Sequence, residues 1–174
     1  SSIITIICFP WSGKTILAGL FNKPIFIQAE KASTDFENTP IEQQPVFMPM
    51  IPAPDKARAV SSRAIVREQL LELATAEHDF KTIIIDSITS LNDLYEKEVV
   101  AFDAAGADSI GNAAGGYHKG YDVVAGYHAD LIRMAAHLTK KGIAVVFIAH
   151  VGVAKIKSSP DEAAEYTVWS VGMH

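Results

Sequence analysis

"IICFPWSGKTILAG", residues 6–19, is the part of the sequence that indicates the fold most clearly. Gly13, Lys14 and Thr15 close a segment of the form G-x-x-x-x-G-K-[ST], except that Cys8 stands where the first glycine belongs. In that pattern a strand runs into a tight turn and then a helix, so several backbone N–H groups and the positive end of the helix dipole point at one spot. The sequence therefore predicts a phosphate-binding loop.

The residue types in the loop suit a nucleotide with its metal. We expect the Lys14 ammonium to reach the β- and γ-phosphates and the Thr15 hydroxyl to ligate Mg²⁺. Cysteine is small and Pro10 already fixes one backbone angle of the turn, so we expect the loop to survive with some strain and Cys8 to act as a packing residue. The alternative is a chance S-G-K-T in an ordinary loop. The predicted nucleotide-binding residues are Pro10, Trp11, Ser12, Gly13, Lys14, Thr15 and Ile16.

On both sides of the loop, short apolar runs alternate with amphipathic segments. We predict four strands, the first of them buried on both faces, at residues 3–8, 24–29, 81–87 and 143–150. Helices are predicted from 14 to about 21, over 61–78, from 87 to about 104, and over 121–140. This alternation predicts an α/β fold with a mostly parallel sheet covered by helices on both faces.

Two segments fall outside that alternation. Residues of about 31–60 hold five of the eight prolines and read as an irregular excursion. Within it the apolar stretch "PVFMPM" (45–50) either covers the nucleotide base or contacts another subunit. The C-terminal segment from about residue 153 reads as a β-hairpin around a proline-containing turn. The chain ends sooner after it than we expect for the fold, so we expect a mobile tail beyond it.

Composition bounds the class of protein. With 174 residues, 49% apolar and 20% charged, residues 1–174 form a single globular domain by size. A net charge of -5 argues against coating duplex nucleic acid by bulk attraction, although a local basic strip can still follow one strand. One cysteine indicates a reducing compartment. No apolar run is long enough to span a membrane, so we expect the cytoplasm and no membrane partner.

Three polar side chains come at the ends of predicted strands. Asp86 follows "TIII" and is expected to hold the metal's water shell, helped by Ser87; the alternative is a helix cap. Glu30 ends the second strand, beside the loop strand if the sheet order is the usual one, and is a candidate for orienting water; otherwise it is a solvated acid. His150 ends the fourth strand, where it can sense the γ-phosphate unless it is structural.

These residues, in this order, resemble the RecA-like recombination ATPases. The likeness is closest to the short phage-encoded nucleotide-binding proteins of that superfamily, which are thought to act in single-strand recombination and annealing. It rests on the phosphate loop at the start and Glu30 after the second strand. The stretches "IIIDSITSL" (83–91), "GNAAGGYHKGY" (111–121) and "KKGIAVVFIAH" (140–150) follow, with the basic hairpin behind.

The resemblance implies a RecA-like P-loop NTPase core that hydrolyses ATP with Mg²⁺. It gives Asp86 the role of the metal-strand acid, Glu30 that of the catalytic glutamate and His150 that of the sensor, alongside Lys14 in the loop. It also implies a homo-oligomer, a ring or a filament, in the host cell cytoplasm if the chain is phage-encoded. The departures are Cys8 and the absence of the N-terminal extension by which long recombinases dock onto the next subunit.

Two loops would face DNA in this superfamily. The first offers aromatic faces for bases and a lysine for phosphate, at Tyr117, His118, Lys119 and Tyr121. The second offers Lys155 and Lys157. The alternative for the tyrosines is packing of the next helix. For the lysines it is a solvated strand face, or a reach across a subunit boundary to the neighbour's γ-phosphate.

The leading hypothesis is thus an ATPase coupled to single-stranded DNA, with a single-strand-binding or annealing protein as a partner. A helicase or helicase loader shares the core, and a non-hydrolysing, nucleotide-gated binding protein stays open because of Cys8 and Glu30. A small-molecule kinase is disfavoured, since the chain has four arginines and none after Arg133, where a phosphate-clamping lid often lies.

Overall fold

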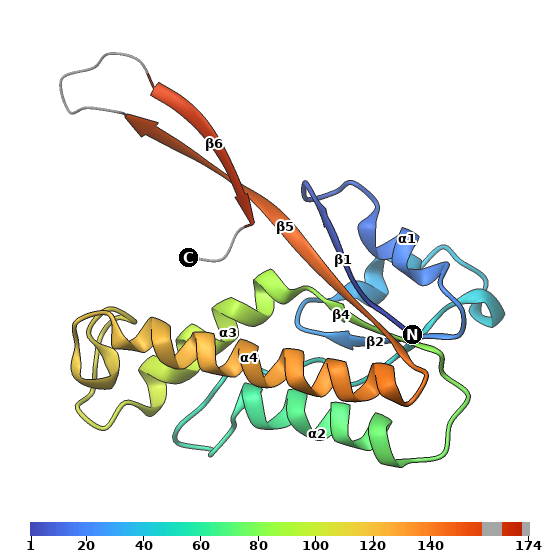
Figure 1. Cartoon of the computed structure of the whole chain (residues 1–174), viewed down its shortest axis with the longest axis horizontal. Coiled ribbons are helices and arrows are strands. Elements are labelled where there is room, and N and C mark those ends of the chain that lie inside the picture. Colours follow the sequence, from blue (N-terminus) through green and yellow to red (C-terminus); the bar gives the residue numbers. More distant parts are fainter. Residues whose placement is uncertain (158–164, 172–174) are drawn as a thin grey trace.

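The computed structural model describes the backbone of residues 1–157 and 165–171 and the side chains of residues 1–152 (Figure 1). The strands are β1 (Ile3–Cys8), β2 (Pro24–Gln28), β3 (Val46–Phe47), β4 (Thr82–Asp86), β5 (Ala144–Lys157) and β6 (Glu165–Val171). The helices are α1 (Lys14–Gly19), α2 (Ser62–Thr75), α3 (Ile88–Phe102) and α4 (Lys119–Lys140). Three 3-10 turns join them: η1 (Ala32–Phe36), η2 (Ile41–Gln43) and η3 (Ala113–Gly115). Within the described ranges, no helix has the length and apolar character needed to cross a bilayer.

The strands form one sheet in the order β1-β5-β4-β2-β3, and all of these neighbours are parallel. The fourth predicted strand, β5, lies between β1 and β4 and therefore separates the two strands that carry the loop and Asp86. β6 pairs with the distal part of β5 in antiparallel fashion, from Val151↔Val171 to Lys157↔Glu165. The predicted α/β fold with a mostly parallel sheet and a C-terminal hairpin is confirmed. The predicted turn, residues 158–164, lies outside the described residues.

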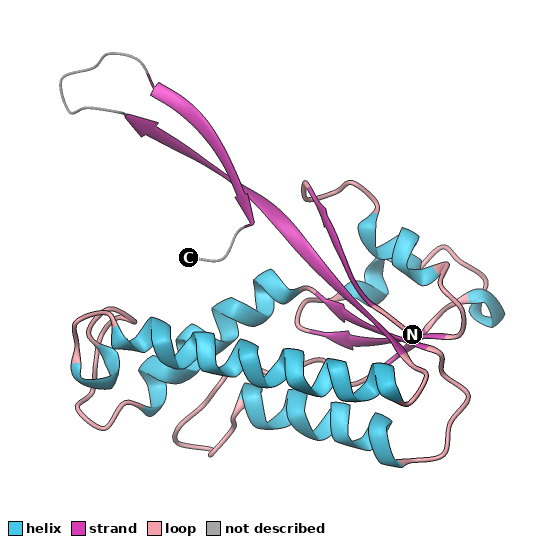
Figure 2. Ribbon diagram, viewed as in Figure 1, coloured by secondary structure: helices cyan, strands magenta, loops and turns pink. Residues whose placement is uncertain are grey.

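Helices cover both faces of the sheet (Figure 2). Alternate residues of the central strands point to opposite faces, as the two-residue period of a strand requires. One set packs under α2, α3 and α4 and includes Ile83, Ile85 and Val145. The other set, which includes Ile84 and Val146, packs under α1 and η1. The two apolar cores hold the sheet rigid, so its strand ends form a fixed platform.

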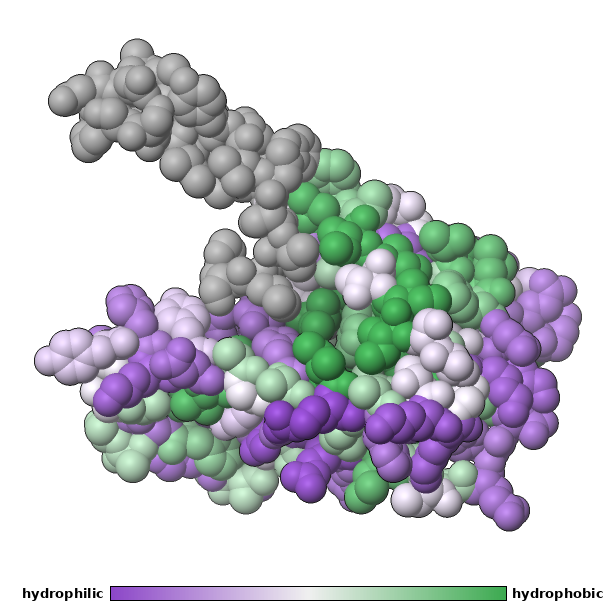
Figure 3. Space-filling model, in the orientation of Figure 1, coloured by the Kyte–Doolittle hydropathy of each residue, from purple (hydrophilic) through white to green (hydrophobic). Residues whose placement is uncertain are grey.

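The structure differs from the sequence prediction at β1. The prediction of burial on both faces is wrong: exposed and half-buried residues alternate along the strand, and Ile3 and Ile7 are 40% and 49% exposed. The reason is position, because β1 lies at the edge of the sheet and pairs only with β5. An edge strand with the same β-branched composition as a central strand buries only one of its faces. In Figure 3 apolar residues gather on the surface near this edge.

The proline-rich segment is more ordered than predicted. It contains η1, η2 and β3, which adds the last parallel strand beside β2. The ring of Phe47 lies 5.2 Å from that of Phe26, and Ile51 is buried under the helices. The stretch 45–50 therefore packs against the sheet, which neither of the two predicted roles had assumed.

Candidate functional site

The carboxyl ends of β1, β4 and β2 meet at one edge of the sheet, beside the middle of β5. The prediction that the fourth strand ends at His150 is wrong, because β5 continues to Lys157 by pairing with β6. In the strand register Cys8 lies beside His150, and Gln28 beside Asp86. Next to this edge is a hollow of about 530 Å³, which we call the strand-end pocket. Its lining includes every predicted nucleotide-binding residue together with the three predicted strand-end side chains: Pro10, Trp11, Ser12, Gly13, Lys14, Thr15, Ile16, Glu30, Asp86 and His150. Pro10 and His150, which are 140 positions apart in the chain, are thereby brought to one place.

The loop backbone explains why Cys8 is tolerated. Gly13 has φ +77° and Trp11 has φ +62°, the left-handed region that favours glycine. Cys8 is not among the positive-φ residues and does not line the pocket. The backbone conformation at the position of the first glycine is therefore one that residues other than glycine adopt. The Trp11 side chain is fully exposed at the mouth of the loop.

Lys14 lies against the loop that it belongs to. Its side chain is buried, and its Nζ donates to the Phe9 carbonyl at 2.5 Å and approaches the Ser12 Oγ at 3.4 Å. The Ser12 hydroxyl donates to the same carbonyl at 2.8 Å. The Lys14 ammonium thus lies at the floor of the pocket, held by neutral oxygens. An anion bound there would meet that charge in a partly desolvated setting, where attraction is strong.

Thr15 and Asp86 connect the loop to β4 across the intervening strand. The Thr15 hydroxyl donates to Asp86 Oδ2 at 2.8 Å, and Asp86 is fully buried. Its other oxygen, Oδ1, has no hydrogen-bond partner among the described residues. Burial, with the charge of Glu30 nearby, raises the pKa of Asp86 to about 7. A hydroxyl and an under-satisfied carboxylate are hard oxygen donors, so these two residues fit a Mg²⁺ ion.

Glu30 reaches the pocket by a route that the sequence did not predict. The expectation that its strand lies beside the loop strand is wrong, because β2 neighbours β4 and is separated from β1 by β4 and β5. Instead, the turn after β2 folds over the end of β4. The backbone N–H groups of Ala29 and Glu30 both donate to the Asp86 carbonyl, at 2.8 and 3.1 Å. This turn brings the Glu30 carboxylate to the pocket wall.

The two oxygens of Glu30 have different partners. Oε1 lies 2.8 Å from His150 Nε2, and Oε2 accepts from the Ser90 hydroxyl at 2.9 Å. Burial opposes ionisation of Glu30, but the hydrogen bonds of His150 and Ser90 outweigh it and hold the pKa below its ordinary value. The pKa values of these two neighbouring carboxyl groups are thus shifted in opposite directions: that of Asp86 is raised and that of Glu30 is lowered. Such a split is typical of sites where one acid must stay ionised.

The first turn of α3 supplies residues that the sequence analysis missed. Besides Ser90, the Thr89 hydroxyl accepts from the His150 backbone N–H at 3.0 Å. Ser87 caps the helix, accepting from Ser90 N at 3.1 Å, and donates to the Ser90 hydroxyl. Ser87 rather than Asp86 is therefore the cap, and its hydroxyl is engaged within the helix instead of assisting Asp86. In the sequence, the hydroxyl-rich run "DSITS" (86–90) is the feature that could have indicated Thr89 and Ser90.

Four further residues line the pocket from the segment after β2, namely Lys31, Ala32, Thr34 and Asp35. They lie on or beside η1, in the segment that the sequence analysis treated as irregular. The charge of Asp35 adds to the rise in the pKa of Asp86, after the larger effect of burial. The 3-10 turn η1 thus contributes to the lining of the pocket together with the loop.

The predicted DNA-binding residues lie elsewhere. Tyr117 is 92% exposed and precedes α4, whose N-terminal residue is Lys119. The His118 ring stacks on Tyr121, with centroids 5.9 Å apart. In Figure 1 this loop lies at the end of the molecule away from α1. Lys155 and Lys157 belong to β5, but their side chains lie outside the described residues.

The comparisons with known proteins agree with this geometry. The family model described as AAA domain matches residues 3–173. The chain belongs to this AAA domain family. A search of curated proteins found no match. Membership makes the chain a P-loop ATPase-type domain and confirms that part of the resemblance drawn from the sequence. The family implies nucleotide hydrolysis in general and, usually, Mg²⁺ binding.

Proposed function

We propose that this AAA domain binds Mg·ATP in the strand-end pocket and hydrolyses it to ADP and phosphate, and that hydrolysis is coupled to single-stranded DNA in recombination or annealing. The observation that carries the nucleotide part is the contact between Thr15 and Asp86, 2.8 Å long, beside the buried Lys14. Residues 71 positions apart thereby put a hydroxyl, a carboxylate and an ammonium around one hollow.

Each residue has a distinct task in the proposed reaction. Lys14 leaves the Phe9 carbonyl for the phosphates, and Thr15 and Asp86 hold the metal. Mg²⁺, when bound, offsets negative charge on the transferred phosphoryl group. Glu30 orients the attacking water and accepts its hydrogen bond, which requires the ionised form that the lowered pKa provides. The separate roles of Glu30 and Asp86 agree with the opposite shifts of their pKa values.

His150 would link the pocket to DNA. Its ring contacts Glu30, while its backbone lies in β5, which continues without a break into the hairpin pairing that starts at Val151. A change at Glu30 on nucleotide binding therefore has a rigid path to the hairpin. The exposed Tyr117 and the hairpin lysines Lys155 and Lys157 are the surfaces proposed for the strand of DNA.

The proposed setting follows the sequence-based expectations. We place the protein in the cytoplasm, where its single cysteine stays reduced. A homo-oligomer, ring or filament, would bring further subunits to the DNA, and a single-strand-binding or annealing protein would act on the same strand. The sign and size of the DNA effect on ATP turnover separate this proposal from an ATPase without a DNA role.

The experiment is phosphate release by the purified chain with Mg·ATP, with and without a single-stranded oligonucleotide. Release is expected to rise when DNA is added and to be lost in Lys14→Ala. A matched control is Lys23→Ala, since Lys23 is exposed and pairs with Asp79 away from the pocket. Release that does not respond to DNA would contradict the DNA coupling. Absence of release with folded protein, or full release by Lys14→Ala, would contradict the nucleotide assignment.

A further inference from the structure

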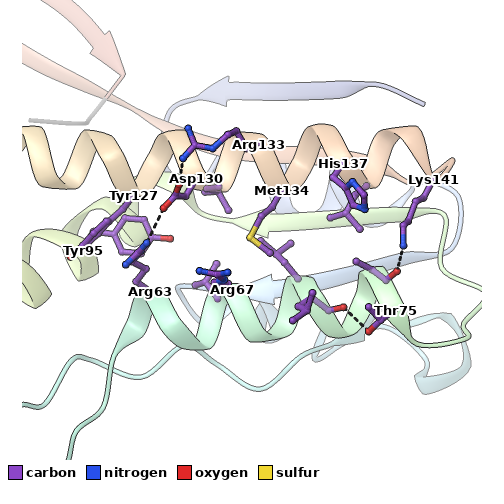
Figure 4. A pocket seen from close by; sticks show the side chains of 16 residues that line it. Arg63, Arg67, Thr75, Tyr95, Tyr127, Asp130, Arg133, Met134, His137 and Lys141 are labelled. Atoms are coloured by element: carbon purple, nitrogen blue, oxygen red, sulfur yellow. Dashed lines mark hydrogen bonds and ion pairs between the residues drawn. The ribbon is translucent and has the colours of Figure 1, made fainter.

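A second hollow lies between α2 and α4, on the face of the sheet that α2, α3 and α4 cover (Figure 4). We call it the α2–α4 groove; its volume is about 400 Å³, and it shares no lining residue with the strand-end pocket. The two helices run in the same direction. Arg63, near the start of α2, pairs with Asp130, and Ala74, near its end, accepts from Lys141 just beyond α4. Nothing in the proposed ATPase reaction uses this groove.

The groove is long and straight. Its lining runs along one stripe from Tyr127 on α4 to Lys141 just beyond that helix, and on α2 from Arg63 to Thr75. At 1.5 Å per residue, these stripes span roughly 20 Å and 18 Å. A third helix of three to four turns has that length, and helices pack against one another at about 8–10 Å between axes. A compact small molecule would occupy only part of such a trough.

The floor of the groove is apolar. Leu70, Leu131 and Leu138 are buried at its base, and Met134 points from α4 toward α2. Leu71 remains 54% exposed beside them. Methionine adapts its shape to a partner more easily than branched side chains do. An occupant must therefore present an apolar face, which a hydrated phosphate backbone does not.

The rim of the groove is basic in a chain whose net charge is -5. Three of the four arginines of the sequence, together with His137 and Lys141, line it against one carboxylate. That carboxylate, Asp130, bonds to both Arg63 and Arg133, which hold its pKa below its ordinary value. Within the part of the chain that the structure describes, Arg67 forms no salt bridge. The occupant should therefore carry negative charge on its flanks.

One contact fixes the rim in place. The Arg63 guanidinium lies 4.4 Å from the centre of the Tyr127 ring, while also bonding to Asp130 at 2.8 Å. A preorganised arginine loses less side-chain entropy on binding than a free one, and arginine and tyrosine are enriched in the central parts of protein interfaces. Apolar length and basic edges together describe a helix-in-groove binding mode.

We propose that the α2–α4 groove binds an amphipathic helix of three to four turns from a partner protein, with leucine-type side chains on one face and acidic side chains on both flanks. The leucines pack on Leu70, Met134 and Leu138, and the acids meet Arg67, Arg133 and Lys141. This binding goes beyond the proposed ATPase function and does not depend on it.

The test uses a fluorescein-labelled peptide of about 18 residues, with leucine at the i, i+4, i+7 and i+11 positions and glutamate on both flanks. A control peptide has lysine in place of every glutamate. Fluorescence anisotropy with the full chain should show binding of the acidic peptide and not of the basic one. Arg67→Glu should weaken this binding about tenfold or more, because it places a negative charge against negative flanks.

The matched control variant is Arg58→Glu, which makes the same change of charge at the arginine that lies outside the groove. The affinity of Arg58→Glu for the acidic peptide should lie within about twofold of that of the unchanged chain. Both variants should give the circular dichroism spectrum of the unchanged chain. The proposal is overturned if the acidic peptide does not bind or if both variants bind alike. Two other results would also overturn it. If a single-stranded oligonucleotide displaces the peptide, then the occupant is nucleic acid. If sedimentation shows a dimer that is lost in Arg67→Glu, then the occupant is a second copy of the chain.

Discussion

The strand-end pocket and the α2–α4 groove are hollows of comparable size, about 530 and 400 Å³, that gather charge in opposite ways. In the pocket the charged groups are inside: Lys14 and Asp86 are buried, and one oxygen of Asp86 has no hydrogen-bond partner in the described part of the chain. In the groove the charges lie on an exposed rim above an apolar floor. A buried charge acts strongly at one point, whereas rim charges orient a partner whose affinity comes from area.

The two arrangements of charge support different kinds of chemistry. The buried Asp86 and the half-buried Glu30, whose pKa values are shifted in opposite directions, suit a reaction at one phosphoryl group, since the local field is strong and the geometry fixed. A long trough with exposed cations suits recognition of a surface. If this contrast holds, substitutions in the pocket should act on catalysis, and substitutions in the groove should act on stability or peptide binding.

The largest effect is expected from Glu30→Gln. Removing the carboxylate that orients water should lower ATP turnover by about 10²- to 10⁴-fold, while nucleotide affinity stays within about threefold. Phosphate release at saturating Mg·ATP and calorimetric titration measure the two quantities. The acidic peptide should still bind in the groove. Normal turnover by this variant would show that Glu30 is a solvated acid.

In the groove, neighbouring leucines on α2 should behave differently. Leu70 is 1% exposed and Leu71 is 54% exposed. Leu70→Ala should lower the free energy of unfolding by about 2–5 kcal/mol, because it leaves a cavity in the core. Leu71→Ala should change it by less than about 0.5 kcal/mol, as at other surface positions. Urea denaturation followed by circular dichroism gives both values, and equal losses would mean that Leu71 is part of the core.

Ser90 tests whether Glu30 needs its second partner. Ser90→Ala removes a hydrogen bond to an ionised acceptor, which is worth about 1.5–3 kcal/mol. If that bond positions the carboxylate for the reaction, kcat falls by roughly tenfold or more while KM stays unchanged, and Ser90→Thr restores most of the rate. A purely structural role would instead lower the unfolding temperature and leave kcat unaltered.

The smallest changes in stability are expected from replacing glycines. Gly13→Ala and Gly126→Ala should change the free energy of unfolding in opposite directions. Gly13→Ala should destabilise the chain by about 1–2 kcal/mol, because φ is +77° there although a Cβ meets no atom within 4 Å. Gly126→Ala, in the exposed middle of α4, should stabilise it by about 0.5–1 kcal/mol. Thermal unfolding without nucleotide compares them. A shift of the same sign in both would remove the special role of the Gly13 conformation.

The strand-end pocket could be predicted from the sequence because its residues follow apolar runs. Parallel strands bring their carboxyl ends to one edge, so Asp86 and His150 were placed near Lys14 without knowledge of the strand order. The path of Glu30 could not be predicted, since it depends on a turn whose N–H groups bond to the Asp86 carbonyl. Ser90 and Thr89 were missed because hydroxyls after a strand resemble ordinary helix caps.

The groove and the exposure of β1 could not be predicted for a different reason. The groove residues recur every three or four positions on two helices, and such a pattern reads as a core-facing stripe. Only the tertiary arrangement shows that part of the stripe stays uncovered. Likewise, "IITIIC" and "TIIID" look alike as sequences, but the first forms an edge strand and the second a fully buried central one.

Calorimetric titration of the folded chain with Mg·ATP tests the central claim most directly. We expect saturable heat with one nucleotide bound per chain, which is lost in Lys14→Ala and kept in Lys23→Ala. If the folded chain takes up no nucleotide, or if Lys14→Ala binds as well as the unchanged chain, then the strand-end pocket is not a triphosphate site.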